Sequence, residues 1–184
     1  MKNRKNLYWF NLSTDSENLV LNFGIDWINE ASMYFEKVYV YSTHVGNYKV
    51  ANNVEVRELG GGTLKNRLVA ITRLMKITFR ILRNNKSSVV FNHMNEKTAA
   101  FTSPFTMIFR VSNSLWYSHS KNSLTLNISR PFLSNFFTTY SNSIPFKSSK
   151  VHHIGHLIDT NKFYVSNILS VRNNRILFVG RISK

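Results

Sequence analysis

Short apolar runs alternate along the chain with longer segments in which apolar residues recur every three or four positions. The short runs predict strands at residues 7–12, 38–42, 54–59, 89–92, 115–118, 135–140 and 151–154. The longer segments predict helices at residues 16–35, 64–83, 96–111 and 124–132, and Pro104 predicts a break or kink in the third helix. Strands that alternate with helices are typical of βαβ units. The pattern therefore predicts an α/β fold with a mostly parallel sheet and helices on both faces.

Three histidines follow predicted strands within two residues: His44, His93 and His119. In a parallel α/β sheet, ligands bind outside the carboxyl ends of the strands, so these positions are where a functional site is expected. A single histidine in such a loop is more commonly a neutral loop residue. The recurrence at three strands is what indicates a shared site.

The composition adds a strong electrostatic signal to this pattern. The 184 residues include no cysteine, which excludes disulfides, thiolate zinc sites and a cysteine nucleophile. The net charge is +15, and a field of this sign attracts nucleic acid, anionic lipid headgroups or substrates that contain a diphosphate. A biased base composition of the gene is the alternative source of the charge. No segment reaches the roughly 18 apolar residues of a membrane-spanning helix.

The predicted helix at 64–83 is basic and amphipathic. Four cations recur at steps of three and four residues and share one face: Arg73, Lys76, Arg80 and Arg83. Apolar residues lie toward another face: Leu68, Ile71, Met75 and Leu82. Such a helix predicts a surface for an anionic membrane or for a lipid-diphosphate acceptor, and the alternative is a solvated charged face.

The histidines at 152, 153 and 156 do not form a metal-binding pattern. On a strand, residues 152 and 156 share a face whereas residue 153 points away. No carboxylate lies at a suitable spacing, so we predict no metal site.

Four phrases, in their order and spacing, give the chain a family resemblance. These are VVFNHM at 89–94, WYSH at 116–119, IGHLID at 154–159 with a phenylalanine at 163, and FVGRIS at 178–183. Together they resemble the family 4 (group 1) glycosyltransferases, which are retaining GT-B enzymes. The resemblance covers most of residues 89–183 and implies that residues 1–170 form a Rossmann-like, acceptor-side amino-terminal domain. It also implies that residues 171–184 are the start of a carboxyl-terminal nucleotide-sugar domain.

The sequence departs from the family pattern at several points. Leu157 replaces the usual second glycine of the turn at 154–159, and the loop after the first strand lacks the paired glycines of many members. The donor-binding loops, the basic pair for the diphosphate and the E-x7-E motif would all follow Lys184. We therefore expect a truncated chain that binds no cofactor by itself, with the nucleotide-sugar donor implied for the complete enzyme.

The resemblance also implies roles for individual residues. His93 or His119 is the candidate catalytic histidine, which would hydrogen-bond a sugar hydroxyl or the developing charge. Lys121 would place positive charge beside a phosphate, with Arg73, Lys76, Arg80 and Arg83 as further acceptor or phosphate-binding candidates. Gly155, Asp159, Gly180 and Arg181 would form the interdomain hinge. For each of these positions a purely structural role is the alternative.

The implied function is the acceptor-binding part of a transferase in surface polysaccharide or lipid-linked glycan synthesis. Its partners would be a missing carboxyl-terminal domain or partner chain, a sugar or lipid-diphosphate acceptor, and an anionic membrane surface. The implied location is the cytoplasm, with peripheral attachment to the inner face of the cell membrane. The alternatives are a non-catalytic fragment of a decayed gene and a basic nucleic-acid-binding module, although the sequence contains no recognised nucleic-acid-binding motif.

Overall fold

The computed structural model describes residues 5–60 and 64–155 of the chain. The strands are β1 (Asn6–Thr14), β2 (Val38–Val45), β3 (Val54–Glu58), β4 (Ser88–His93), β5 (Ser112–Trp116), β6 (Asn135–Thr138) and β7 (Val151–His153). The helices are α1 (Phe23–Ser32), α2 (Leu64–Arg83), α3 (Glu96–Ile108) and α4 (Leu124–Ser129), with short 3₁₀ turns at Asn85–Ser87 and Ser141–Ser143. Strands and helices alternate along most of this length, as the hydrophobic pattern predicts.

The seven described strands form one parallel sheet in the order β3-β2-β1-β4-β5-β6-β7. The chain builds outward from β1 to β3, crosses back through α2, and then builds outward in the other direction from β4 to β7. The direction of winding therefore reverses between β1 and β4. The carboxyl ends of these two strands define the topological switch point, where doubly wound folds bind ligands.

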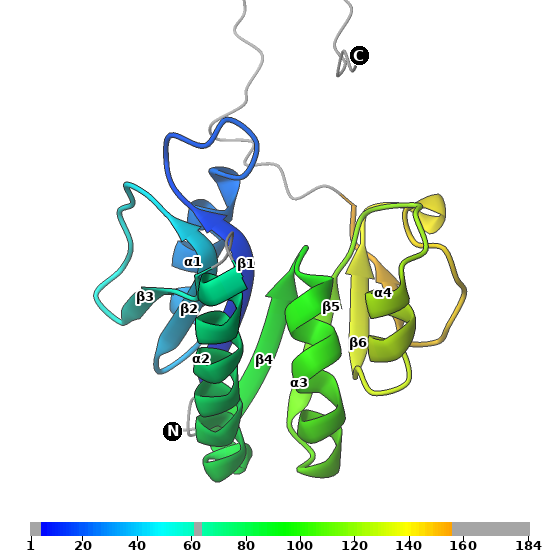
Figure 1. Cartoon of the computed structure of the whole chain (residues 1–184). Coiled ribbons are helices and arrows are strands. Elements are labelled where there is room, and N and C mark those ends of the chain that lie inside the picture. The colour runs from blue at the N-terminus through cyan, green and yellow to red at the C-terminus, as the bar shows by residue number, and fades with distance from the viewer. Residues whose placement is uncertain (1–4, 61–63, 156–184) are drawn as a thin grey trace, which may run out of the picture.

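Both faces of the sheet bury apolar side chains, because successive residues of a strand point to opposite faces. On one face, Tyr8 and Phe10 of β1 pack with Leu74 and Ile81 of α2, and farther along the sheet Leu115 packs with α3 and α4. On the other face, Leu7 and Trp9 of β1 pack with Ile28 of α1. Figure 1 shows α2, α3 and α4 side by side along the sheet. The predicted Rossmann-like α/β architecture with helices on both faces is confirmed.

The first predicted helix was wrong in its extent. Residues 16–22 form turns, and α1 begins only at Phe23. The side-chain oxygen of Asp15 accepts the Glu17 N–H, and that of Asn18 accepts the N–H groups of Val20 and Leu21. These local bonds give the backbone an alternative to the helical ladder.

Two further boundaries differ from the prediction. α3 continues through Pro104 to Ile108, so the proline does not break it. β5 begins at Ser112 rather than at residue 115, because the buried Asn113 side chain bonds within the protein instead of facing water. The three glycines at 60–62 predict a loop and Thr63 predicts a cap for the helix that follows, and residues 61–63 lie outside the described residues.

Candidate functional site

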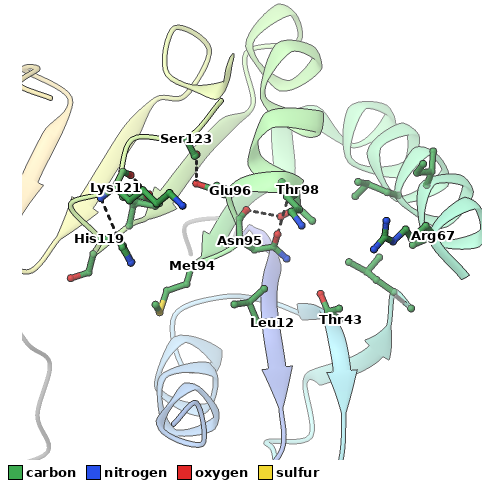
Figure 2. A pocket seen from close by; sticks show the side chains of 18 residues that line it. Leu12, Thr43, Arg67, Met94, Asn95, Glu96, Thr98, His119, Lys121 and Ser123 are labelled. Atoms are coloured by element: carbon green, nitrogen blue, oxygen red, sulfur yellow. Dashed lines mark hydrogen bonds between the residues drawn. The ribbon is translucent and has the colours of Figure 1, made fainter. Parts of the chain in front are cut away.

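A cavity of about 800 Å³ lies at the carboxyl ends of the strands, at the switch point between β1 and β4. Residues at or just after the ends of five strands line it: Leu12, Thr43, Leu59, Met94 and Tyr117. α2 contributes Arg67 and Ile71, and the first turn of α3 contributes Glu96, Lys97 and Thr98. Figure 2 shows His119 and Lys121 on one side of this cavity and Arg67 on the other.

The turn between β4 and α3 forms the floor of the cavity and is tightly constrained. Met94 has a φ of 53°, a left-handed conformation that is costly for a residue with a side chain. Its N–H donates to the carbonyl of Trp116. Asn95 caps α3 by accepting the Thr98 N–H, and its side-chain amide donates to the carbonyl of Asn11 in β1. The turn is thus fixed to both neighbouring strands.

The loop after β5 is ordered by two hydrogen bonds that fix its histidine. The Tyr117 hydroxyl donates to the Lys121 carbonyl at 2.6 Å, and the Lys121 N–H donates to Nδ1 of His119 at 3.0 Å. Because Nδ1 is an acceptor, the neutral His119 ring carries its proton on Nε2. The exposed imidazole therefore offers a hydrogen-bond donor at the cavity.

Glu96 and Ser123 connect the starts of α3 and α4 across the cavity wall. The Ser123 hydroxyl donates to Oε2 of Glu96 at 2.7 Å and accepts the Leu126 N–H as the cap of α4. Burial and the nearby Glu96 raise the pKa of Tyr117, so this tyrosine remains a neutral hydrogen-bond donor at physiological pH.

The electrostatics of the cavity favour an anion. Three cations line it, Arg67, Lys97 and Lys121, against the single carboxylate of Glu96, which already accepts a hydrogen bond. The amino terminus of α3, where Asn95 accepts the Thr98 N–H, adds the positive end of the helix dipole. Apolar side chains of α2, including Ile71 and Leu74, form the opposite wall. The cavity therefore suits a ligand with an anionic group and an apolar part.

His93, the other candidate histidine, lies on the opposite face of the sheet, beneath α1. It is 3% exposed, and its ring lies 5.0 Å from that of Trp27, 5.5 Å from Phe23 and 5.9 Å from Trp9. Burial lowers its pKa to about 4, so the imidazole is neutral at physiological pH. His44 lies within β2, its Nε2 is 3.7 Å from a carboxylate oxygen of Asp15, and it does not line the cavity. Only His119 of the three faces the cavity.

The four cations predicted to share a face of α2 divide into two groups. Arg73 donates to the carbonyls of Glu58 and Leu59 at the end of β3. The Arg80 guanidinium stacks 4.6 Å from the centre of the Tyr39 ring. Lys76 and Arg83 are exposed and form no hydrogen bond or ion pair with other described residues. Arg73 therefore contacts the end of the edge strand β3 and Arg80 packs on β2, whereas Lys76 and Arg83 are available to a partner.

The remaining sequence candidates are only partly within the structure. Gly155 follows β7 with a φ of 70°, a conformation that favours glycine, as expected of a turn. The other hinge candidates, Asp159, Gly180 and Arg181, lie outside the described residues, as do the expected domain boundary at 170/171 and His156. Among residues 5–60 and 64–155, no group of three potential metal ligands comes together.

Several residues of the cavity were not predicted from the sequence. Met94, Asn95, Glu96 and Ser123 directly follow a strand or begin a helix, which is the position that the fold class assigns to ligand contacts. The sequence predicted Arg67, with Lys65, to extend the basic patch of the helix, whereas Arg67 in fact lines the cavity. A helical projection of residues 64–83 that included the buried positions would have placed it near the strand ends.

A second concavity of about 800 Å³ lies on the face of the sheet that α1 partly covers. Aromatic side chains dominate it, including Trp27, Phe91 and Phe137. It lacks the convergence of strand ends and cations that distinguishes the cavity at the switch point. The switch-point cavity is therefore the candidate functional site.

No protein-family model and no curated protein sequence matches the chain. Among solved structures, the chain is similar to HepE (Alr3699) of Anabaena, determined in complex with UDP, with a TM-score of 0.56 and 12% sequence identity over 88% of this chain. It is also similar to MurG of Acinetobacter baumannii, with a TM-score of 0.51 and 11% identity over 80% of this chain.

The chain spans about half the length of these two proteins, 47% of HepE and 44% of MurG. At such low identity, the likeness concerns the fold alone. The protein has a Rossmann-like α/β fold that is also present in these two proteins.

Proposed function

We propose that this chain is the acceptor-side domain of a GT-B-type glycosyltransferase that acts in surface polysaccharide or lipid-linked glycan synthesis. Residues 1–170 would form this domain and residues 171–184 would begin the next one. The fold, the coverage of about half of two GT-B proteins and the four family-like phrases at 89–183 support the proposal. The complete enzyme would be formed with a second domain or a partner chain.

The observation that best supports this function is the cavity at the switch point. It combines cations, the amino terminus of α3 and a histidine donor on one side with apolar residues of α2 on the other. This arrangement suits a sugar or lipid acceptor that contains a phosphate or diphosphate. The acceptor is thus the ligand that we assign to the described residues.

Within this site, His119 is the catalytic candidate that we favour. Its Nε2–H would donate to a sugar hydroxyl or to the charge that develops during transfer, and Lys121 would contribute positive charge beside a phosphate. We assign His93 a positioning role, since it packs beneath the turn that presents Met94 and Asn95. Arg73 would act through β3 and Arg80 through β2, and Gly155 would begin the interdomain hinge.

The donor side of the reaction would belong to the second domain. In this division of roles a nucleotide-sugar binds there, and the described residues supply the acceptor surface. Pure protein of residues 1–184 is then expected to show no sugar-nucleotide turnover. We further propose that the enzyme works in the cytoplasm, attached peripherally to the inner face of the cell membrane.

Equilibrium binding of farnesyl diphosphate tests the assignment of the cavity. The Lys121→Gln substitution removes a charge-assisted hydrogen bond and is expected to weaken binding about tenfold. The Lys147→Gln substitution removes an exposed cation outside the cavity and should change the affinity less than twofold. Equal affinities for both variants, or turnover of a UDP-sugar by residues 1–184 alone, would show that the proposal is wrong.

A further inference from the structure

Helix α2 has three faces rather than the two of an ordinary surface helix. Leu74, Thr78 and Ile81 are buried against the sheet. A second face contains only apolar side chains at steps of three and four residues, and it is open to solvent: Leu68, Ile71, Met75 and Phe79. The third face holds Arg73, Lys76, Arg80 and Arg83. An amphipathic helix that buried all of its apolar residues would lack this exposed second face.

The exposed apolar side chains of α2 are large. Leu68 is 60% exposed, Met75 57% and Phe79 69%. Single exposed apolar residues are common in soluble proteins, but a run along about three turns of one helix creates a continuous surface. Such a surface indicates a partner that buries it.

The end of the neighbouring helix also exposes apolar side chains. α3 packs beside α2 along the same face of the sheet, as Figure 1 shows. Ile108 is 70% exposed and Phe105 44% exposed. We refer to Leu68, Ile71, Met75, Phe79, Phe105 and Ile108 together as the α2–α3 surface.

The charges beside this surface are of one sign. Residues 64–83 contain six basic residues and no acidic residue: Lys65, Arg67, Arg73, Lys76, Arg80 and Arg83. Lys76 and Arg83 form no ion pair with other described residues, so they remain available to an anionic partner. A second copy of the chain would bring these like charges together, which disfavours self-association through this surface. Anionic lipid headgroups would complement the charges, and the acyl region would bury the apolar side chains.

We propose that the α2–α3 surface lies in the interface of a bilayer containing anionic lipids, with Met75 and Phe79 inserted and with Lys76 and Arg83 at the headgroups. No helix in the described residues is long and apolar enough to cross a membrane, so the contact is peripheral. Ile71 belongs both to this surface and to the wall of the switch-point cavity. On the basis of the proposed function, docking in this orientation places the acceptor cavity beside the lipid headgroups.

Co-sedimentation of the 184-residue chain with lipid vesicles tests this inference. Vesicles of phosphatidylglycerol and phosphatidylethanolamine should bind the chain, whereas phosphatidylcholine vesicles should not. The double substitution Met75→Ser and Phe79→Ser should weaken partitioning about tenfold or more. Each of Lys76→Gln and Arg83→Gln should weaken it about fivefold. Raising the salt concentration should reduce the electrostatic part of the binding.

The opposite side of the sheet provides matched controls. Met33 follows α1 and is 55% exposed, close to the value for Met75, and Lys49 is an exposed lysine near α1. Met33→Ser and Lys49→Gln should leave partitioning unchanged. All variants should keep the wild-type thermal transition, because every substituted side chain is exposed.

Three outcomes would overturn the inference: binding to phosphatidylcholine alone, equal loss in the control variants, or a dimer that Met75→Ser and Phe79→Ser abolish. None of these vesicles contains a diphosphate acceptor. Failure of vesicle binding together with retained binding of farnesyl diphosphate would therefore reject the docking surface and leave the proposed function standing.

Discussion

At the scale of single residues, two histidines that look equivalent in the sequence have different environments. His93 and His119 each lie at or just after the end of a strand, within phrases that resemble the same family. β4 alternates Val89, Phe91 and His93 on one face with Val90 and Asn92 on the other. This alternation directs His93 under α1. His119 lies beyond the end of its strand, so the alternation does not constrain it.

The buried His93 makes the stability of the fold depend on pH. Its folded-state pKa is about 4, below the ordinary value of 6.5, because burial penalises the charged ring. Between pH 6.5 and 4 the unfolded chain binds a proton at this position and the folded chain does not. The free energy of unfolding should therefore fall by about 3 kcal/mol as the pH decreases from 6.5 to 4. Above pH 6.5 the ring is neutral in both states, so His93 should cause no loss of stability there.

Denaturant unfolding of the wild type and of His93→Phe across pH 4–8 measures this effect. The wild type should lose stability relative to the variant as the pH falls below 6.5, since phenylalanine does not titrate. Parallel pH profiles for the two proteins would mean that His93 is not buried as a neutral ring.

At the scale of elements, a polar network joins β4 and β5 to α3. Asn113 accepts a hydrogen bond from the Asn92 amide at 2.8 Å and donates to the hydroxyls of Thr102 and Thr106 at 3.1 and 3.0 Å. All four residues are fully buried. The hydrophobic pattern did not predict the first half of β5, because a polar residue in the sequence indicates a loop even where the folded protein buries it.

Asn113→Ala should destabilise the protein by about 3 kcal/mol, because it leaves buried hydroxyl and amide groups without their partner. Asn127→Ala, at an exposed position in α4, should change the free energy of unfolding by less than about 0.5 kcal/mol. Chemical denaturation of both variants at neutral pH provides the comparison. A loss of similar size in both variants would contradict the role given to the network.

The agreement or disagreement between sequence pattern and burial explains which elements were predictable. Residues 64–83 were identified correctly because the helical spacing is sustained over 20 residues, and the β-branched run 38–42 because its pattern and its burial agree. Residues 16–22 were assigned to a helix because apolar residues occur there at helical spacing. Leu19 is in fact exposed, and the side chains of Asp15 and Asn18 hold the backbone in turns.

At the scale of the whole molecule, the sequence was sufficient to predict the α/β class and the parallel sheet, and the prediction of a site at the carboxyl ends of the strands stays a prediction. The sequence could not show which residues at those strand ends converge. The cavity depends on the crossover through α2, which brings Arg67 and Ile71 beside the loop of His119 and Lys121. The exposed stripe of α2 likewise emerges only when burial separates Leu74 and Ile81 from Met75 and Phe79.

The central claim is that the switch-point cavity is an acceptor site, and amide chemical shifts measured during a titration with farnesyl diphosphate test it most directly. We predict that saturating shifts concentrate at Met94, Lys97, His119 and Lys121, around the amino terminus of α3 and the loop after β5. A UDP-sugar titrated under the same conditions should leave the chemical shifts of these amides unchanged. Shifts confined to Lys76 and Arg83, or a stronger response to the UDP-sugar at the cavity, would contradict the account.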